Sequence, residues 1–331
     1  DELKAKGFEP SLIISHPQWG ETFFMKQIWP DAKFLSYFEI HWGNNEDSDV
    51  NFDKEFYDEE FQRFTERKLV PRNAYNEYIY MKSDRILTPT EFQKSTAPDY
   101  LQKRIKVIHD GINTNIIKPS NDVEVNISDN LKLTKKDKII SFVNRTLEPQ
   151  RGYHIFMRSL PKILKEDSEV NVLIIGGNER GYGLEPPVGK KWQNIFYDEV
   201  KGNLDQSRVH FLGRIEYKAL IAILQVTTLH VYLTYPFVLS WSLLEAMACE
   251  SLILASKTAP VTEVIQNNKN GLLIDFFDIK GLSKIALDVL NNSDKYNDIR
   301  KQGRKTIINK YDLKKKCLPE QIKLVKEMLS K

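Results

Sequence analysis

The chain of 331 residues is long enough for two domains, and its hydrophobic (41%) and charged (28%) contents are ordinary for a globular protein. Its 48 basic and 45 acidic residues leave a net charge of +3, which is too balanced to indicate a nucleic-acid partner. Two cysteines exclude a disulfide framework and suit a reducing compartment, no Cys/His spacing resembles a zinc site, and no segment approaches the about 20 apolar residues of a membrane-spanning helix.

Short apolar runs alternate with longer amphipathic segments along the whole chain. Strands are predicted over residues 12–15, 33–37, 85–88 and 105–108, and then over 138–143, 172–175, 208–212, 229–233, 251–255 and 272–274. Helices are predicted between them, over 153–166, 217–224, 242–248, 259–266 and 279–290. Apolar strands that alternate with helices are typical of parallel sheets covered on both faces. The sequence therefore predicts an α/β fold with two doubly wound domains.

The boundary between these domains is predicted near residues 110–130, where the sequence is polar and is punctuated by Gly111 and Pro119. We expect an N-terminal domain over residues 1–118, a C-terminal domain over 119–310 and a final helix over 311–331. A doubly wound domain normally opens with a strand, but residues 1–7 are typical of the end of a helix. We therefore expect the first strand or strands to precede Asp1.

Residues 44–73 separate two predicted strands and are strongly charged. Connections of this length are usually functional lids or mobile segments, and the alternative is a solvated helical excursion. The sequence leaves both interpretations open.

Glu245 is the single carboxylate in the otherwise apolar segment 241–248. A lone buried charge is costly unless it is paired. Residues 242–245 match the capping box S-x-x-E, which would satisfy this carboxylate locally. Alternatively, a carboxylate near a helix N-terminus at the carboxyl edge of a parallel sheet can accept two hydrogen bonds from a nucleotide ribose. The local sequence does not decide between the two.

The wider sequence contains a loop, then Leu-Glu-Ala-Met-Ala at 244–248, a strand at 251–255, Glu263, and Asn-Gly at 270–271. This set of motifs resembles the signature of family-4 retaining glycosyltransferases. The resemblance covers residues 138–290 well and the first domain more loosely. It implies the GT-B fold, in which two Rossmann-like domains face each other across a cleft and a C-terminal helix crosses back to the first domain. In the tail, Leu318, Ile322, Val325 and Leu329 have the spacing of one helix face.

The resemblance also implies roles for the basic and acidic residues of the second domain. Glu245 would bind the ribose of the nucleotide. Arg145 and Arg151 match the positions of a family arginine and lysine that face the diphosphate. Departure of a nucleotide diphosphate builds negative charge, which fixed cations stabilise, so both arginines are candidate catalytic residues.

The donor loop departs from the family pattern. Most members have a glutamate that contacts the donor sugar where this chain has Phe237, and they have glycines where it has Val238 and Ser240. The backbone N–H groups of the loop would still reach sugar or phosphate. The remaining donor candidates are Phe237, Val238, Leu239 and Ser240 in this loop, and Gly213, Arg214 and Ile215 around the nucleobase.

In the first domain, His16 ends a predicted strand and matches a family histidine that points into the cleft near the donor sugar. It is the third candidate catalytic residue. Trp19, Glu21, Tyr37 and Glu39 follow neighbouring strands and are candidate acceptor contacts, with packing or surface polarity as the alternative.

The activity implied by the resemblance is a retaining hexosyltransferase. It would use a nucleotide-diphosphate sugar, with a UDP-sugar favoured, and a glycan or lipid-linked acceptor in bacterial polysaccharide biosynthesis, without a metal ion or other cofactor. We expect a cytoplasmic protein. The basic run 314–316 is interpreted as a solvated helix face, with peripheral contact to the inner membrane face as the alternative. Two other functions stay open, a GT-B nucleotide-sugar epimerase and a catalytically silent nucleotide-sugar-binding partner of another transferase.

Overall fold

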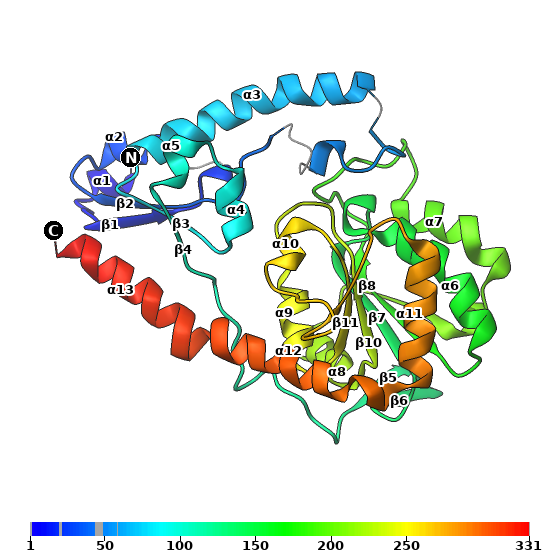
Figure 1. Cartoon of the computed structure of the whole chain (residues 1–331). Helices are drawn as coiled ribbons and strands as arrows, with labels where there is room; N and C mark the ends of the chain where they lie inside the picture. The colour runs from blue at the N-terminus through cyan, green and yellow to red at the C-terminus, as the bar shows by residue number, and fades with distance from the viewer. Residues whose placement is uncertain (1, 20–21, 44–48, 58, 331) are drawn as a thin grey trace. The chain divides into compact units, whose positions relative to one another are not determined.

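The computed structural model describes residues 2–19, 22–43, 49–57 and 59–330. The chain divides into two compact units (Figure 1). The first comprises Asp1–Gly111, Pro236–Val238 and Leu313–Lys331, and the second comprises Ile112–Tyr235 and Leu239–Asp312. Among the described residues, no helix combines the length and the apolar character needed to cross a membrane.

The first unit is built on a parallel sheet with the strand order β1-β2-β3-β4. Its strands are β1 (Leu12–Ser15), β2 (Lys33–Tyr37), β3 (Arg85–Thr88) and β4 (Ile105–Val107). Its helices are α1 (Glu2–Ala5), α2 (Met25–Ile28), α3 (Glu59–Lys82), α4 (Glu91–Thr96), α5 (Asp99–Gln102) and α13 (Leu318–Leu329), with the short turns η1 (Pro17–Trp19), η2 (Asp49–Asn51) and η7 (Leu313–Cys317). The apolar runs of the sequence predict these strands to within one residue.

The charged segment 44–73 resolves mainly into helix. The 24-residue helix α3 occupies its second half and continues to Lys82, with Pro71 inside the helix. The turn η2 lies in its first half, while residues 44–48 and 58 are outside the described part of the chain. Of the two interpretations of this segment, the helical one therefore holds for residues 59–73.

The C-terminal helix α13 packs on the sheet of the first unit. Leu324 and Met328 are buried in one apolar cluster with Leu35 of β2, Leu87 of β3 and Ile108. The GT-B expectation that the final helix returns to the first domain is thus met.

The buried face of α13 differs from the one that the apolar spacing predicts. Leu318, Ile322 and Leu329 are 40%, 44% and 50% exposed, so the predicted stripe is wrong for these three residues. The reason is that the i, i+4 pair Leu324 and Met328 fills the apolar cluster on the sheet.

The second unit contains a six-stranded parallel sheet with the order β12-β11-β10-β7-β8-β9. Its strands are β7 (Ile139–Thr146), β8 (Asn171–Gly177), β9 (Val209–Gly213), β10 (Leu229–Tyr232), β11 (Leu252–Ser256) and β12 (Leu272–Ile274). This is the order of a Rossmann-like doubly wound sheet. The four central strands are almost entirely buried, which explains why most of their residues are apolar.

Helices cover both faces of this sheet (Figure 1). On one face, α6 (Tyr153–Glu166) packs against α7 (Trp192–Val200) and α11 (Ile279–Asn291). On the other, α9 (Trp241–Ala248) packs against α8 (Tyr217–Val226) and α12 (Asn297–Lys310). The remaining helical elements are α10 (Ala259–Thr262) and the turns η3 (Pro149–Arg151), η4 (Lys201–Asn203), η5 (Gln206–Arg208) and η6 (Ser293–Tyr296).

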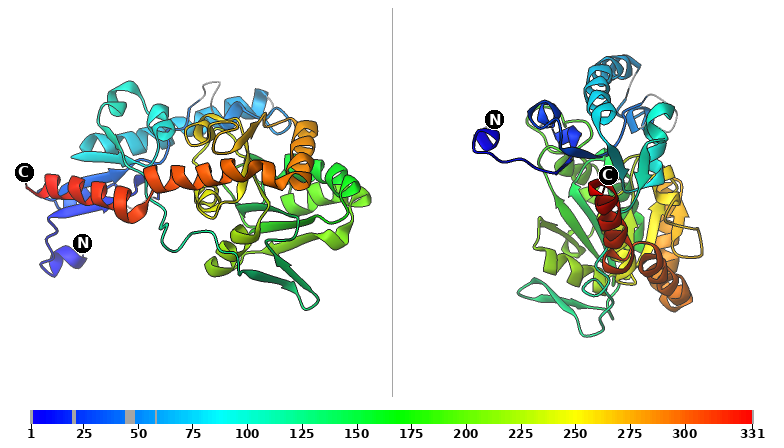
Figure 2. Two further views of the ribbon diagram at one scale, coloured as in Figure 1. Left: turned by 60° about the horizontal axis from the view of Figure 1, so that its bottom comes forward. Right: turned by 90° about the vertical axis from the view of Figure 1, so that its left-hand side faces the viewer.

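A separate antiparallel hairpin opens the second unit (Figure 2). It consists of β5 (Glu124–Ser128) and β6 (Leu131–Thr134), which pair only with each other. The sequence predicts a domain boundary over residues 110–130 but does not predict this hairpin.

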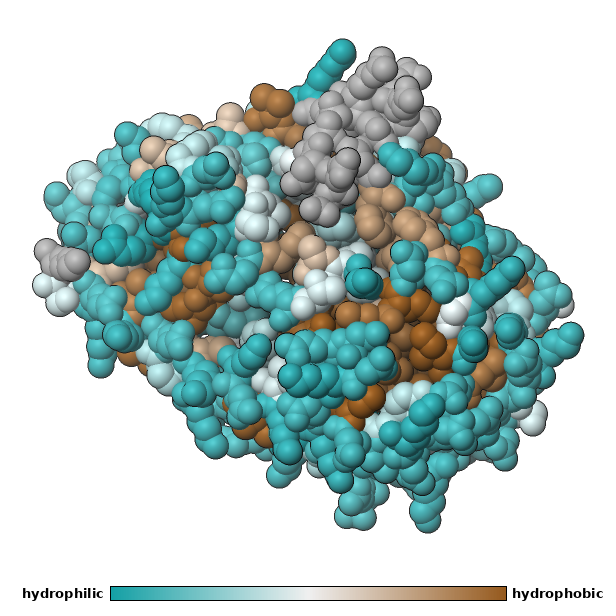
Figure 3. Space-filling view, viewed as in Figure 1, coloured by the Kyte–Doolittle hydropathy of each residue, from teal (hydrophilic) through white to brown (hydrophobic). Residues whose placement is uncertain are grey.

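On the face of the molecule drawn in Figure 3, hydrophilic residues predominate, and apolar residues appear there in smaller groups.

Candidate functional site

The centre of the second sheet contains a topological switch point between β7 and β10. These strands are neighbours, but the chain proceeds from β7 outward to β8 and β9, and from β10 outward to β11 and β12. The connections after β7 and β10 therefore diverge at the carboxyl edge of the sheet, where doubly wound folds bind ligands. The candidates Arg145, Arg151 and Glu245 all follow these two strands or end one of them.

Arg151 is a buried cation at this switch point. It ends the turn η3 directly after β7 and is only 7% exposed. Its Nη1 donates a hydrogen bond of 2.9 Å to Thr234 Oγ1, on the connection after β10. The backbone N–H of Tyr235 donates to the carbonyl of Gln150, also at 2.9 Å. The two connections are thus bridged, and the guanidinium is held at the crevice between them.

Gly152 lets the chain turn next to Arg151. Its φ is +69°, in the left-handed region that favours glycine. A Cβ at this position would collide with the side chain of Leu233, which follows β10. The Arg-Gly pair of the sequence therefore has a structural reason, a tight turn pressed against the neighbouring strand connection.

Arg145 lies near the end of β7 and is exposed, in contrast to Arg151. Its Nη1 donates a 2.9 Å hydrogen bond to the hydroxyl of Tyr182, and its guanidinium lies 5.6 Å from the centre of that ring. Arg145 therefore lies near the end of β7, and Arg151 lies just after it. Arg145 is exposed and contacts an aromatic ring, whereas Arg151 is buried.

Glu245 lies in α9 and is 5% exposed. Its Oε1 accepts a short hydrogen bond of 2.6 Å from the hydroxyl of Tyr217, the first residue of α8. Burial raises the pKa of Glu245, and the hydrogen bond from Tyr217 acts in the opposite direction. Burial and the carboxylate of Glu245 raise the pKa of the Tyr217 hydroxyl.

The capping-box interpretation of Glu245 is wrong. Helix α9 begins at Trp241 and its N-cap is Ser240, whose side chain accepts a hydrogen bond from the N–H of Ser242. Ser242 is already inside the helix, so Glu245 is not at the third position after the cap. The Glu245 carboxylate, on α9, instead contacts Tyr217, on α8.

The loop before α9 carries the other donor candidates. Phe237 is buried and its ring lies 5.6 Å from that of Trp42 within the first unit, to which Pro236–Val238 belong. Leu239 is buried in the core of the second unit. The N–H of Ser240 donates to the hydroxyl of Tyr232 at 2.8 Å, so this N–H has a protein partner.

The nucleobase candidates lie at the end of β9. Gly213 has a φ of +63° and open space where a Cβ would be, and it is exposed. The side chain of Arg214 forms an ion pair with Glu179. Ile215 is partly buried and packs against the main core of the second unit. The exposed backbone at Gly213 is therefore compatible with a ligand contact.

The first unit brings its predicted residues together at the ends of β1 and β2. The ring of His16 is stacked on Tyr37 at 5.2 Å and meets Trp19 edge-on at 5.7 Å. Its Nε2 lies 3.4 Å from a carboxylate oxygen of Glu39. Burial lowers the pKa of His16, which favours the neutral imidazole. The fifth predicted residue of this unit, Glu21, lies outside the described residues.

Several residues that contact the donor and acceptor candidates were not predicted from the sequence. Asp110 accepts hydrogen bonds of 3.0 and 2.9 Å from the Tyr37 hydroxyl. Tyr217, Tyr182 and the buried Glu148 contact the donor candidates or the loop beside them. The one signal in the sequence was Glu148, a carboxylate placed between two arginines.

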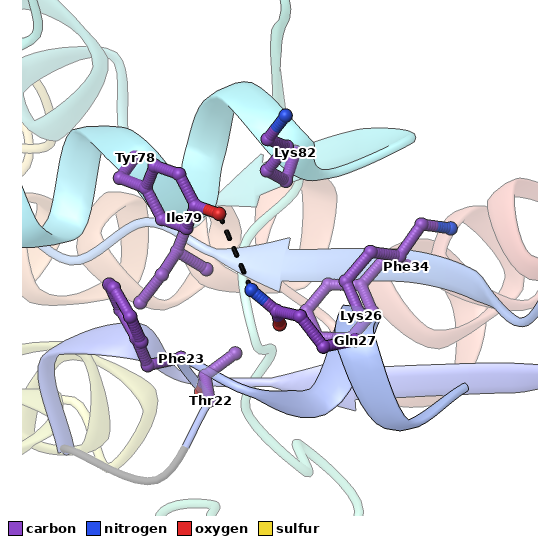
Figure 4. A pocket seen from close by; sticks show the side chains of 8 residues that line it. All are labelled: Thr22, Phe23, Lys26, Gln27, Phe34, Tyr78, Ile79 and Lys82. Carbon is purple, nitrogen blue, oxygen red and sulfur yellow. Dashed lines mark hydrogen bonds between the residues drawn. The ribbon is translucent and has the colours of Figure 1, made fainter. Parts of the chain in front are cut away.

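The described residues line a pocket in each unit. One of about 430 Å³ in the second unit is lined by Thr146, Leu147 and the loop from Asn178 to Trp192. The other, of about 200 Å³ in the first unit, is shown in Figure 4; it is lined mainly by Phe23, Phe34, Tyr78 and Ile79. The side-chain amide of Gln27 lies 3.4 Å from the Tyr78 hydroxyl (Figure 4), and the ammonium of Lys82 lies 5.8 Å from the centre of the Tyr78 ring. Of the described residues that line this pocket, none is a predicted site residue.

Comparisons with known proteins match both halves of the chain. Residues 1–117 match the family described as glycosyl transferase family 4 group, and residues 124–306 match glycosyl transferases group 1. An uncharacterised glycosyltransferase of Methanocaldococcus jannaschii is 22% identical over 227 residues, which cover 69% of this chain and 55% of that protein. A probable sucrose-phosphate synthase of Thermosipho melanesiensis is 24% identical over 230 residues, covering 69% of this chain and 48% of that protein. The chain thus spans about half the length of these relatives.

Solved structures share the fold at low sequence identity. A sucrose-phosphate synthase of Thermosynechococcus elongatus has a TM-score of 0.76 and 17% identity, over 99% of this chain and 76% of that chain. Anabaena HepE, solved in complex with UDP and glucose, has a TM-score of 0.68 and 14% identity, over 97% of this chain and 78% of that chain. The expected fold class, α/β with two Rossmann-like domains of the GT-B type, is confirmed.

Proposed function

Because the chain belongs to the glycosyltransferases group 1 family, we propose that it transfers a hexose from a nucleotide-diphosphate sugar to a glycan or lipid-linked acceptor. A UDP-sugar is the favoured donor. The transfer retains the anomeric configuration and requires no metal ion. Its proposed setting is bacterial polysaccharide biosynthesis in the cytoplasm, with peripheral contact to the inner membrane face as the alternative to a fully solvated surface.

One observation supports this proposal. Two arginines and one buried carboxylate lie on the segments that end or follow β7 and β10, the two strands that flank the switch point of the second sheet. Arg145 and Arg151 supply positive charge for a diphosphate, and Glu245 supplies acceptor oxygens for a ribose diol. The nucleotide complexes of HepE, which shares the fold, support UDP as the ligand to test first.

The proposed transfer gives each candidate residue a simple chemical role. As the bond between the sugar and the phosphate breaks, negative charge grows on the phosphate oxygens, and Arg145 and Arg151 stabilise it. The acceptor hydroxyl attacks from the same face, and its proton passes to the departing phosphate. No protein nucleophile is then needed. His16, with its neutral imidazole favoured by burial, would contact the donor sugar, while Trp19, Tyr37 and Glu39 would contact the acceptor.

Two other functions stay open, and Phe237 bears on the first of them. It offers no oxygen for a donor sugar, so a catalytically silent nucleotide-sugar-binding protein is one alternative. A nucleotide-sugar epimerase on the same fold is the other.

The experiment that separates these functions uses radiolabelled UDP-glucose, UDP-galactose and UDP-N-acetylglucosamine, each with and without a bacterial lipid extract as acceptor. A transferase moves label into the extract and releases UDP, with the α-configuration preserved in the product. An epimerase makes a new nucleotide sugar without any acceptor. Binding of the nucleotide sugar with neither product would contradict the proposed transferase and favour the silent partner.

A further inference from the structure

Glu148 is a buried carboxylate for which the proposed chemistry has no direct use. It lies between Arg145 and Arg151 in the sequence and is 2% exposed. Its two oxygens accept hydrogen bonds from the backbone N–H groups of Tyr182, at 3.3 Å, and Gly183, at 2.9 Å. Burial raises the pKa of Glu148, and these N–H groups and the two arginines act in the opposite direction. Through these two hydrogen bonds, Glu148 therefore links the loop after β8 to the connection after β7.

The loop is shaped around this carboxylate. A Cβ added at Gly181 would collide with the Glu148 side chain. A Cβ at Gly183 would lie 3.1 Å from the Gln150 Cβ, closer than most real contacts. The Gly-Tyr-Gly sequence thus allows the backbone to wrap closely around Glu148, and it fixes where Tyr182 projects.

Tyr182 in turn contacts Arg145. Its hydroxyl accepts a 2.9 Å hydrogen bond from Nη1, and the guanidinium stands over its ring at 5.6 Å. Arg145 is exposed, and an exposed arginine has many rotamers of similar energy. A hydrogen bond combined with a cation–π contact selects one of them before any ligand arrives.

We propose that Glu148 and Tyr182 are positioning residues that hold Arg145 ready for the diphosphate: Glu148 fixes the backbone of Tyr182, and Tyr182 fixes the guanidinium. This inference rests on the proposed function, because Arg145 acts there on the leaving diphosphate. In this proposal neither positioning residue contacts the substrate. The effect of removing the Tyr182 hydroxyl should therefore depend on Arg145, whereas Glu148 also lies near Arg151.

A double-mutant cycle tests this dependence. UDP carries the charge of the leaving group, so its dissociation constant is measured by calorimetry for wild type, Tyr182→Phe, Arg145→Ala and the double variant. Tyr182→Phe keeps the ring but loses the hydroxyl, and we expect it to weaken UDP binding about 3- to 10-fold. In the Arg145→Ala background the same change should alter the constant by less than about twofold.

Two further variants complete the experiment. Glu148→Gln keeps the shape but turns an amide N–H₂ toward one backbone N–H, and it should weaken UDP binding at least as much as Tyr182→Phe. Tyr197→Phe removes another tyrosine hydroxyl of this unit, which donates to Gln206, and should leave UDP binding unchanged.

The outcomes distinguish failure of the positioning proposal from failure of the proposed function. An unchanged affinity in Tyr182→Phe, or an equal loss with and without Arg145, overturns the positioning proposal while wild-type binding leaves the proposed function intact. If the wild type binds none of UDP, GDP and ADP, the proposed function fails and the positioning proposal falls with it. Melting temperatures of all variants are measured alongside, and if Glu148→Gln does not fold, the Tyr182 cycle still decides.

Discussion

Arg145 and Arg151 stand on the same connection but differ in burial, so their removal should have different costs. Arg145→Ala and Arg151→Ala should both lower kcat more than they raise KM, because the charge they stabilise grows in the transition state. Arg151→Ala should also lower the free energy of unfolding by about 1–3 kcal/mol, since it leaves the buried Thr234 hydroxyl without its donor. Steady-state kinetics and thermal unfolding check this pair. A loss for Arg145→Ala that lies wholly in KM would reduce that residue to ground-state binding.

Glu245 should show opposite effects on stability and on binding. Glu245→Gln should weaken nucleotide binding by about 1–3 kcal/mol, the scale of a hydrogen bond to a charged group. The ligand-free variant should nevertheless melt at or above the wild-type temperature at neutral pH, because its amide oxygen still accepts from Tyr217 and no charge is buried.

The pH dependence of this stability effect has a definite sign. Burial raises the pKa of Glu245 in the folded protein, so the folded state holds this proton more tightly than the unfolded chain. The stability of the wild type therefore falls as the pH rises from the unfolded pKa through the raised folded pKa. The advantage of Glu245→Gln should grow across this window and shrink below it. Melting curves from about pH 4 to pH 8 measure this, with the exposed Glu327→Gln as control. A Glu245→Gln advantage that is constant with pH would contradict the account.

Under the proposed function, Phe237 should weaken the discrimination between epimeric donor sugars. Its ring is buried beside Trp42 and offers no hydrogen-bond acceptor, so the sugar hydroxyls would depend on backbone N–H groups of the loop, the Ser240 hydroxyl and His16. We expect kcat/KM for UDP-glucose and UDP-galactose to agree within about tenfold, or about 1.4 kcal/mol. Phe237→Glu should lower the melting temperature because it buries an unpaired charge. Selectivity of several hundred-fold in the wild type, roughly 3–4 kcal/mol, would refute the claim.

At the scale of elements, the turn between β7 and α6 depends on Gly152. Gly152→Ala should lower the free energy of unfolding by about 2–4 kcal/mol, because it combines a positive φ with a collision against Leu233. Gly189→Ala has a similar φ of +77° but open space, and Gly202→Ala has neither feature. Chemical denaturation should rank the three losses in that order. Equal losses for Gly152→Ala and Gly189→Ala would show that the collision is unimportant.

The elements also show where sequence patterns were sufficient. Strands such as β2 and β3 were predicted to the residue, because short runs rich in apolar and β-prone residues between turn signals have few other solutions. The start of α9 was not, because Ser240 and Ser242 are both good caps and the backbone alone selects Ser240. The hairpin β5–β6 had a signal in its alternating residues and its Asp-Asn turn, but the polar composition of the segment concealed it.

At the scale of the whole molecule, two α/β units with parallel sheets could be predicted, while the partners of the site residues could not. Glu245 meets Tyr217 from a helix 28 positions away, and Arg145 meets Tyr182 from a loop 37 positions away. Such pairs depend on how helices pack and loops fold back, which residue types and spacing do not encode locally. The buried face of α13 was missed for the same reason, since only the sheet beneath it distinguishes Leu324 and Met328 from their apolar neighbours.

A crystal structure of the wild-type protein with UDP, grown with a metal chelator present, decides whether the β7–β10 switch point binds the nucleotide without metal. We expect the diphosphate within about 2.7–3.2 Å of the guanidinium groups of Arg145 and Arg151, and the ribose diol on the Glu245 carboxylate. We also expect Tyr182 to remain in contact with Arg145. A nucleotide bound away from the β7–β10 switch point, or one that binds only when a divalent metal is supplied, would contradict this expectation.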